Sequence, residues 1–205
     1  MLFTELKNYV VFDLEMNGSN QIIEIGALKV TTGQDIEKFS VIVNNPPMGS
    51  GMASFKFISQ SMGGDDGWIT LEMIQNGLAE ERALTRFMKF VGDYPVVGHA
   101  IVDGDVQLIK EGLRYNDLGK WKTNGKVFDT QQIHRALNGN PNDISLAGLA
   151  DEYEVEIGTQ KHRALADSRA TLAVFAAMQK VWAKKKDEMN IDVFMALMSR
   201  LRTSF

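Results

Sequence analysis

The first segment that could carry out chemistry is Asp13-Leu14-Glu15, at the end of an apolar, β-branched run that predicts a buried strand over residues 9–14. Side chains alternate along a strand, so the carboxylates of Asp13 and Glu15 point to the same face. Burying unpaired charge is costly, and no lysine or arginine lies within several residues. A hard divalent cation such as Mg²⁺ or Mn²⁺ would balance this charge. If the strand end is exposed instead, both acids are simply solvated.

The second segment runs from Gly98 to Asp105, between a short apolar strand expected over residues 95–99 and a helix expected over 105–114. Asp105 falls in the first helical turn, where the positive end of the helix dipole favours an acidic side chain. Taken alone, this segment therefore indicates a helix-start acid rather than a metal ligand.

The third segment joins His162 to Asp167, at the start of a strongly amphipathic helix expected over residues 165–183. A lone histidine in a loop is more often inert. A histidine beside a cluster of acids is suited to deprotonate water, because its unperturbed pKa lies near neutrality. The five-residue spacing lets His162 face the same site as Asp167.

The elements that must position these segments predict one mixed-sheet α/β domain. Three apolar runs joined by short turns predict an antiparallel meander, and later strands alternate with helices. The strands are expected over residues 9–14, 21–30, 36–43, 95–99 and 126–129, and the later helices over 105–114, 130–137, 145–153, 165–183 and 190–202. Residues 44–67, with two prolines and five glycines, are expected to form a long, mobile loop near the active cleft. The run Lys184–Lys186 is expected to separate the last two helices.

Composition excludes several classes of protein. The 205 residues suggest one domain, with at most an appendage. A formal net charge of −4 excludes binding of nucleic acid by bulk positive charge alone. The absence of cysteine excludes disulfides, thiolate metal sites and a cysteine nucleophile. No run approaches the roughly 18–20 apolar residues of a membrane span, and the N-terminus lacks signal-peptide features. We therefore expect a cytoplasmic protein with no membrane partner.

In this order, the three segments resemble the motifs of the DEDD 3′–5′ exonuclease superfamily, histidine subtype (DEDDh). This group includes the proofreading subunit of bacterial replicative polymerase and ribonuclease T. The resemblance extends from residue 9 to about 180. Its motifs are Asp13-Leu14-Glu15-Met16-Asn17-Gly18, Ile22-Ile23-Glu24-Ile25-Gly26-Ala27, Ile69-Thr70-Leu71-Glu72-Met73, Val127-Phe128-Asp129-Thr130, Ser145-Leu146-Ala147-Gly148-Leu149-Ala150 and His162-x-Ala164-x-x-Asp167. It implies a ribonuclease H-like fold: a mixed five-stranded sheet, first an antiparallel meander and then parallel strands, flanked by helices.

The second of the three segments, from Gly98 to Asp105, departs from the family pattern. The family usually has an asparagine directly after the histidine of this segment and an aspartate five positions after it. In this chain the histidine is His99, and those two positions hold Ala100 and Gly104. Asp105 is the better match, because Asp105-x-x-Leu108-Ile109 resembles the family's helix start. Asp103 is the alternative.

The resemblance implies a catalytic site with two divalent ions, Mg²⁺ or Mn²⁺. Asp13, Glu15 and Asp167 would hold the first ion. Asp13 would also bridge to the second, which Asp105 supports, and His162 would take a proton from the attacking water. Contacts to the terminal nucleotide are expected from Met16, Asn17, Gly18 and His99, although Met16 and Asn17 replace the threonines usual in the family. Lys161, Arg163 and Arg169 are candidates for contact with the strand backbone.

The implied activity is release of nucleoside 5′-monophosphates from the 3′ end of single-stranded DNA, as in proofreading by DNA polymerase III. An RNA-processing 3′–5′ exoribonuclease is the alternative, and a catalytically silent adaptor that binds a polymerase or RNA is a third. The exonuclease domain is expected over residues 1–183. A helical extension over 184–205 would cap this domain or dock on a DNA polymerase subunit.

Overall fold

The computed structural model describes residues 3–61, 68–121, 127–138, 142–158 and 162–188, and every structural statement below concerns this part of the chain. Its centre is a five-stranded sheet with the order β3-β2-β1-β4-β5. β1 pairs antiparallel with β2, and β2 with β3, whereas β1, β4 and β5 are parallel. This confirms the predicted meander followed by parallel strands. The strands are β1 (Tyr9–Met16), β2 (Ile22–Val30), β3 (Glu37–Ile42), β4 (Val96–Gly98) and β5 (Val127–Asp129).

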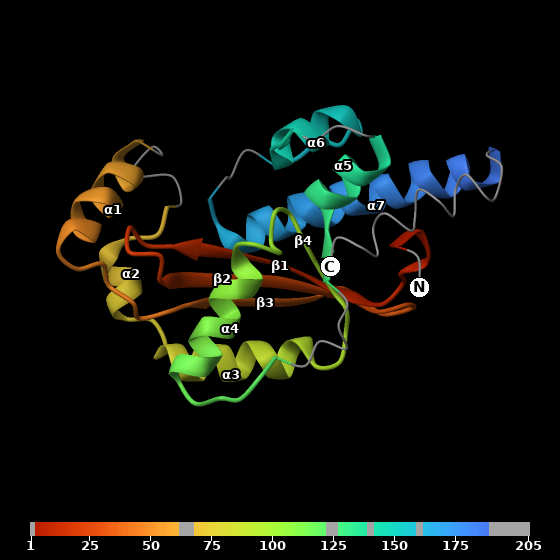
Figure 1. Cartoon of the computed structure of the whole chain (residues 1–205). Coiled ribbons are helices and arrows are strands. Elements are labelled where there is room, and N and C mark those ends of the chain that lie inside the picture. The colour runs from red at the N-terminus through yellow and green to blue at the C-terminus, as the bar shows by residue number, and fades with distance from the viewer. Residues whose placement is uncertain (1–2, 62–67, 122–126, 139–141, 159–161, 189–205) are drawn as a thin grey trace.

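Helices cover both faces of the sheet (Figure 1). α5, α6 and α7 lie on one face, and α3 and α4 lie on the other. The helical elements are a short 3₁₀ helix η1 (Phe3–Glu5), α1 (Ser50–Ser61), α2 (Leu71–Gln75), α3 (Glu80–Val91), α4 (Asp105–Tyr115), α5 (Thr130–Asn138), α6 (Leu146–Glu152) and α7 (Ala164–Glu188). None of these helices is both long and apolar enough to cross a membrane.

Strand alternation in β1 decides which side chains reach which layer. Tyr9 and Val11 pack in the core beneath α7, where the Tyr9 ring meets Phe175 at 5.3 Å between centroids. Val10 and Phe12 pack on the other face, with α3 and α4. Asp13 and Glu15 continue the row of Tyr9 and Val11, so the sheet presents both carboxylates on the face that carries α7.

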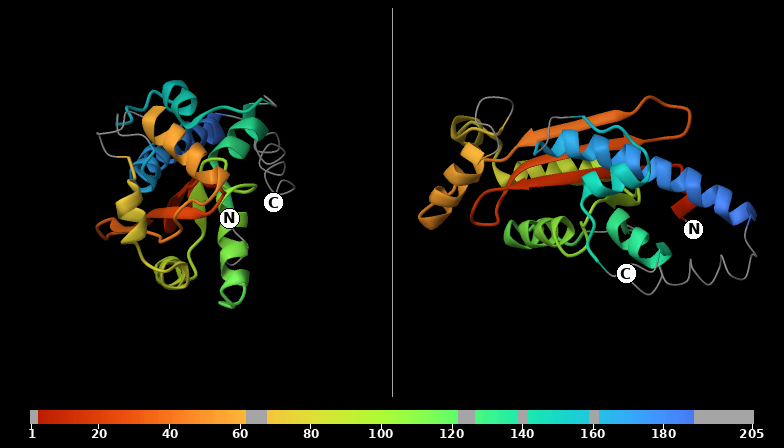
Figure 2. Two further views of the ribbon diagram at one scale, coloured as in Figure 1. Left: turned by 90° about the vertical axis from the view of Figure 1, so that its left-hand side faces the viewer. Right: turned by 90° about the horizontal axis from the view of Figure 1, so that it is seen from above.

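The expectation of a loop throughout residues 44–67 is wrong, because residues 50–61 form α1. The glycines and serines of this segment give little helix propensity, and tertiary packing overrides it. Phe55 is buried with Ile69 and Ile74 in a small separate core. Gly51 lies so close to Gly18 that a Cβ on Gly18 would be 2.6 Å from the Gly51 carbonyl oxygen. Figure 2 shows α1 at the end of the sheet away from the N-terminus.

α7 is longer than the sequence predicted. It continues through Lys184–Lys186 to Glu188 without a break. Lysine is a good helix former, and two of these lysines have acidic partners. Lys184 lies 3.6 Å from Glu188 one turn later, and Lys186 lies 2.9 Å from Glu5. The helix expected over residues 190–202 falls outside the described residues.

Candidate active site

The two carboxylates of β1 sit in a crowded, acidic and poorly hydrated environment. Burial raises the pKa of Asp13 well above its usual value, and the nearby charges of Asp105, Glu15 and Asp167 raise it further. Burial is also the main reason that the pKa of Glu15 rises to about 8, with Asp167 and Glu24 adding to it. Both acids therefore resist ionisation unless a positive charge joins them.

Asp105 enters the same cluster from the first residue of α4. Burial raises its pKa to about 7, although the backbone N–H of Leu14 hydrogen-bonds its carboxylate and works against the rise. Asp103 lies two residues earlier and is exposed. The structure thus brings Asp105, rather than Asp103, beside Asp13.

The loop before Asp105 is held by Asp129, a residue that the sequence motif placed without giving it a task. The buried Asp129 carboxylate accepts hydrogen bonds from the backbone N–H groups of Ala100 at 3.1 Å and Val102 at 3.2 Å. Ala100 has a left-handed backbone with φ of 55°. Asparagine tolerates that conformation better than alanine does, which gives the family's usual asparagine at this position a physical reason.

His162 and Asp167 complete the cluster from the start of α7. The His162 backbone N–H donates to Asp167 Oδ2 at 3.0 Å. Possible ligand atoms of Glu15, His162 and Asp167 all lie within 4.8 Å of one another. In Figure 1 the starts of α4 and α7 lie together beside the end of β1. All five residues expected to do chemistry are therefore brought to one place.

The donor set of this cluster fits a hard divalent cation. Four carboxylates from three elements converge, and the pKa of each is raised chiefly by burial. Oxygen ligands of this kind suit Mg²⁺ and Mn²⁺. A bound cation would offset the repulsion that the cluster otherwise carries.

The raised pKa values predict how stability depends on pH. A carboxyl whose pKa is higher in the folded than in the unfolded state stabilises the fold below its unfolded pKa, and this contribution is lost as pH rises through its folded pKa. For Glu15 the pH window runs from its ordinary pKa of 4.5 to about 8, and for Asp105 from its ordinary pKa of 3.8 to about 7. In a chelator, the melting temperature should therefore fall between pH 5 and pH 8.5, and Mn²⁺ should raise it most at the alkaline end.

Thermal melts across this pH range, with EDTA or Mn²⁺, measure the effect. Glu15→Gln is the matched control, because it removes the strongly shifted carboxyl and should flatten the fall in chelator. A Mn²⁺ effect that is equal at both ends of the range would contradict the assignment of the shifted carboxyls.

The residues expected to contact the terminal nucleotide have different environments. Met16 is 38% exposed at the end of β1, and His99 is half-buried, with Nδ1 2.9 Å from Thr130 Oγ1. The expectation for Asn17 is not supported, because its side chain is only 3% exposed and fully engaged in the β1–β2 turn. Its Nδ2 donates to Gln21 Oε1 and Asn45 O, and its Oδ1 accepts from the N–H groups of Ser19 and Gln21. The Gly18 backbone packs against Gly51 and Ser54 of α1.

Of the three basic residues near His162 and Asp167, Arg163 and Arg169 lie in the described part of the chain, and their surroundings differ. Arg163 binds Glu24, so its guanidinium has a buried carboxylate as partner rather than solvent. Arg169 is exposed and lines a cavity of about 210 Å³ that Asp167 also lines. Arg169 therefore remains the candidate for a phosphate contact, and Lys161 lies outside the described residues.

Trp68 is a neighbour of the site that the motifs did not single out. Its ring meets the His162 ring edge to face, with centroids 6.0 Å apart. The other two tryptophans pack elsewhere: Trp121 is partly buried against Phe12 and Phe87, and Trp182, on α7, is buried and donates its indole N–H to the Tyr153 hydroxyl. Only Trp68 thus stands where it could shape the surroundings of the expected base.

Comparisons with known proteins show what this chain is similar to. A family model described as exonuclease (RNase_T) matches residues 67–175. The PolC-type DNA polymerase III of Staphylococcus saprophyticus is 36% identical over 177 residues, and that of a bovine strain of Staphylococcus aureus is 35% identical over 174. These alignments cover 84% and 83% of this chain but only 11% of each relative. The chain therefore spans about a tenth of the length of these curated relatives.

Solved structures share the fold at low sequence identity. Escherichia coli exonuclease I in complex with a dT13 oligonucleotide has a TM-score of 0.61 and 14% identity, covering 89% of this chain and 42% of that one. Exonuclease X in complex with 5′ overhanging duplex DNA has a TM-score of 0.56 and 18% identity, covering 93% and 99%. A 3′-exonuclease that recognises the 3′ end of a histone mRNA stem-loop has a TM-score of 0.68 and 12% identity, covering 86% and 65%.

Proposed function

Because the chain belongs to this exonuclease family, as a member of its DEDDh type, we propose that it hydrolyses nucleic acid from the 3′ end and releases nucleoside 5′-monophosphates. The observation that carries the proposal is the convergence of Glu15, His162 and Asp167 within 4.8 Å, with Asp13 and Asp105 alongside. A catalytically silent adaptor has no need of a complete set of acids and a base, so this arrangement favours the enzyme.

The acids and the base have separate tasks in this proposal. Asp13, Glu15 and Asp167 would hold one divalent ion, and Asp13 and Asp105 would hold a second. When bound, the ions help activate water and stabilise charge on the phosphate and on the leaving 3′ oxygen. His162 accepts the proton of the attacking water, and its exposed position at the start of α7 lets it pass that proton to solvent. Mg²⁺ and Mn²⁺ both suit this set of oxygen ligands.

We assign single-stranded DNA as the preferred substrate. The curated relatives are DNA polymerases of the PolC type, and exonuclease I was solved with a dT13 oligonucleotide. The likeness to an exonuclease that recognises an mRNA stem-loop keeps RNA as the second candidate. Arg169, beside Asp167, is the proposed contact to a phosphate of either strand.

A direct assay tests the activity and the substrate together. Oligonucleotides of matched sequence, one DNA and one RNA, carry a 5′ label and are incubated with the protein in Mg²⁺, Mn²⁺ or EDTA. We expect stepwise shortening of the DNA from its 3′ end with either metal and none in EDTA. Faster shortening of the RNA would replace DNA by RNA as the substrate. No release of nucleotides from either strand by folded protein would refute the exonuclease.

We further propose that the chain works in the cytoplasm next to a DNA polymerase; its relatives of the PolC type of DNA polymerase III support the polymerase as partner. The exonuclease domain would occupy residues 1–183, and residues 184–205 would supply the contact to a polymerase subunit. Size-exclusion chromatography with the partner polymerase, using the full chain and a chain that ends at Glu188, tests this role. The shorter chain keeps all of α7 and should lose binding but not nuclease activity.

A further inference from the structure

Glu24 is an acid in the interior of β2, and the residues next to it along this strand are apolar. Its side chain is 1% exposed, and Ile22, Ile23 and Ile25 around it are buried as well. In the sheet it stands directly opposite Glu15. A buried carboxylate close to three other acids, Asp13, Glu15 and Asp167, is destabilising unless it is paired and hydrogen-bonded, so its partners decide what it does.

The partners of Glu24 come from the segment between His162 and Asp167. Arg163 Nε lies 3.1 Å from both Glu24 oxygens, and Arg163 Nη2 lies 2.9 Å from Oε1. The Ala164 backbone N–H donates to Oε2 at 2.9 Å. The guanidinium thus grips the carboxylate through two nitrogens, which gives strong charge-assisted bonds with a fixed geometry. The pair is neutral as a whole, so it adds no net charge to the acidic cluster.

Two further contacts fasten the same segment to β2. A Cβ on Gly26 would lie 2.2 Å from the backbone of Ala164 and Leu165, so β2 and the start of α7 touch without a gap. Ser168 Oγ lies 3.0 Å from Gly26 O. Together with the ion pair, these contacts hold the first turn of α7 against β2.

We propose that Glu24 and Arg163 are a positioning pair that holds His162 and Asp167 against the carboxylates of β1; this rests on the function proposed above. Arg163 stands between His162 and Ala164 in the chain, and its carbonyl accepts the N–H of Asp167 at 3.0 Å. Asp167 in turn accepts the N–H of His162. Anchoring Arg163 therefore fixes both residues that α7 supplies, while Glu24, on the strand next to β1, fixes the anchor to the other half of the site.

The double variant Glu24→Gln/Arg163→Met tests the pair without leaving a buried charge alone. Replacing both partners of a buried pair is often close to neutral for stability, so the variant is expected to fold. Loss of positioning should lower kcat and weaken Mn²⁺ binding by about 10–100-fold each, as for other residues that orient metal ligands. KM for the oligonucleotide should stay unchanged, because neither side chain is assigned to the substrate.

Single variants sharpen the test. Glu24→Gln alone leaves the Arg163 cation next to Glu15, whose pKa it already lowers, and should impair Mn²⁺ binding more than the double variant does. Arg163→Lys keeps the charge but loses the two-nitrogen grip, so its kcat should fall between those of the wild type and the double variant. It also serves if the double variant does not fold.

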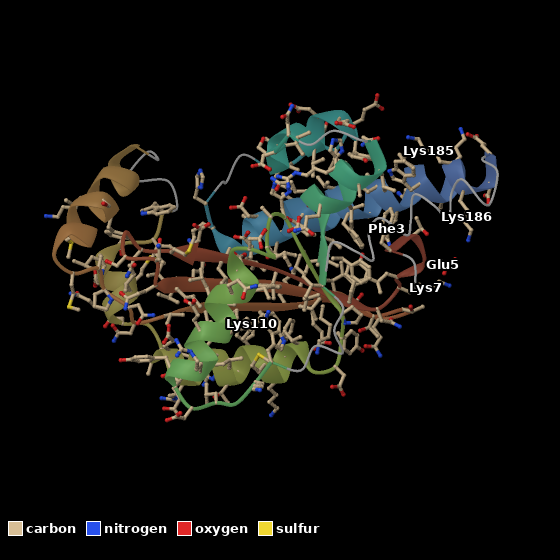
Figure 3. All side chains as sticks on the ribbon, in the orientation of Figure 1. Phe3, Glu5, Lys7, Lys110, Lys185 and Lys186 are labelled. Atoms are coloured by element: carbon tan, nitrogen blue, oxygen red, sulfur yellow. The ribbon has the colours of Figure 1, made fainter. Side chains whose placement is uncertain are left out.

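A second ion pair on α7 supplies the matched control. Glu5 and Lys186 are 2.9 Å apart and lie at the opposite end of α7 from its first turn (Figure 3). Glu5→Gln/Lys186→Met should leave kcat and Mn²⁺ affinity at wild-type values. Gly26→Ala, which would place a Cβ 2.2 Å from the backbone of Ala164 and Leu165, should reproduce the loss of kcat.

Calorimetric titration with Mn²⁺ keeps the proposal separate from the nuclease function. If the wild type bound Mn²⁺ but released no nucleotide, the proposed function would fail, and the Mn²⁺ affinities of the variants would still decide the role of the pair. Wild-type kcat and Mn²⁺ affinity in the folded double variant would overturn the positioning role. So would a loss of activity that only follows the fraction of unfolded protein.

Discussion

Replacing Asp13 by asparagine is expected to abolish nucleotide release, with a fall in rate of roughly 10³-fold or more, because metal ions supply several kcal/mol of transition-state stabilisation and each 1.36 kcal/mol is a factor of ten. Asp13 is the centre of the cluster: the charges of Asp105, Glu15 and Asp167 all act on it. Asparagine keeps the shape of the side chain and removes its charge.

The same substitution should stabilise the metal-free protein at neutral and alkaline pH. It removes one member of a set of mutually repelling carboxylates, so the melting temperature in chelator should rise and the shift produced by Mn²⁺ should shrink. A simple loss of folding gives the opposite sign. Melts of Asp13→Asn with EDTA and with Mn²⁺, together with rates on a labelled oligonucleotide, measure both effects.

Asp103→Asn and Asp105→Asn form the matched pair of controls. Asp103 is exposed and outside the cluster, so its replacement should leave the rate and the Mn²⁺ shift unchanged. Asp105→Asn should behave like Asp13→Asn, in the same direction. An inactive Asp103→Asn variant together with an active Asp105→Asn variant would show that Asp103, and not Asp105, is the metal ligand.

Replacing His162 by glutamine is expected to lower kcat by about 10²–10⁴-fold, the usual contribution of a general base. The imidazole lies within 4.8 Å of possible ligand atoms of Glu15 and Asp167, so the two carboxylates remain to hold an ion. The Mn²⁺-induced rise in melting temperature should therefore persist in this variant. Single-turnover rates at saturating Mn²⁺ separate loss of the base from loss of metal.

His134 provides the control histidine. It is buried in α5, with Nδ1 2.9 Å from Asn138 Nδ2, on a helix that carries no member of the acidic cluster. His134→Gln should lower stability and leave kcat of the folded protein unchanged. If His162→Gln also lost the Mn²⁺ effect, His162 would have to be counted as a metal ligand instead of a base.

Local sequence patterns predicted the five strands and helices α4 to α7 in their order along the chain. The apolar alternation of β1 predicted that Asp13 and Glu15 share a face, and the helix patterns placed Asp105 and Asp167 at helix starts. These predictions depend only on the periods of strands and helices, which are properties of neighbouring residues. The family motifs added the information that the separate segments meet.

Patterns failed where packing between distant segments outweighed local preference. Residues 50–61 have the composition of a loop, yet they form α1, because Phe55 packs with Ile69 and Ile74 in a buried cluster. Asn17 looked available to a substrate, but its amide is used to hold the β1–β2 turn together. The partner that a polar side chain chooses cannot be deduced from its type alone.

The sequence by itself thus predicted the α/β class from the spacing of its apolar residues, and it predicted the acidic cluster and its expected base through the resemblance to the DEDDh motifs. Only the tertiary structure decided that Asp105 rather than Asp103 joins the cluster, and that Arg163 serves Glu24 rather than a phosphate. The two partners of that ion pair lie 139 residues apart in the chain. Such a contact exists only after the sheet has formed and α7 has packed against it, since the burial of Glu24 then makes its charge costly unless it is paired.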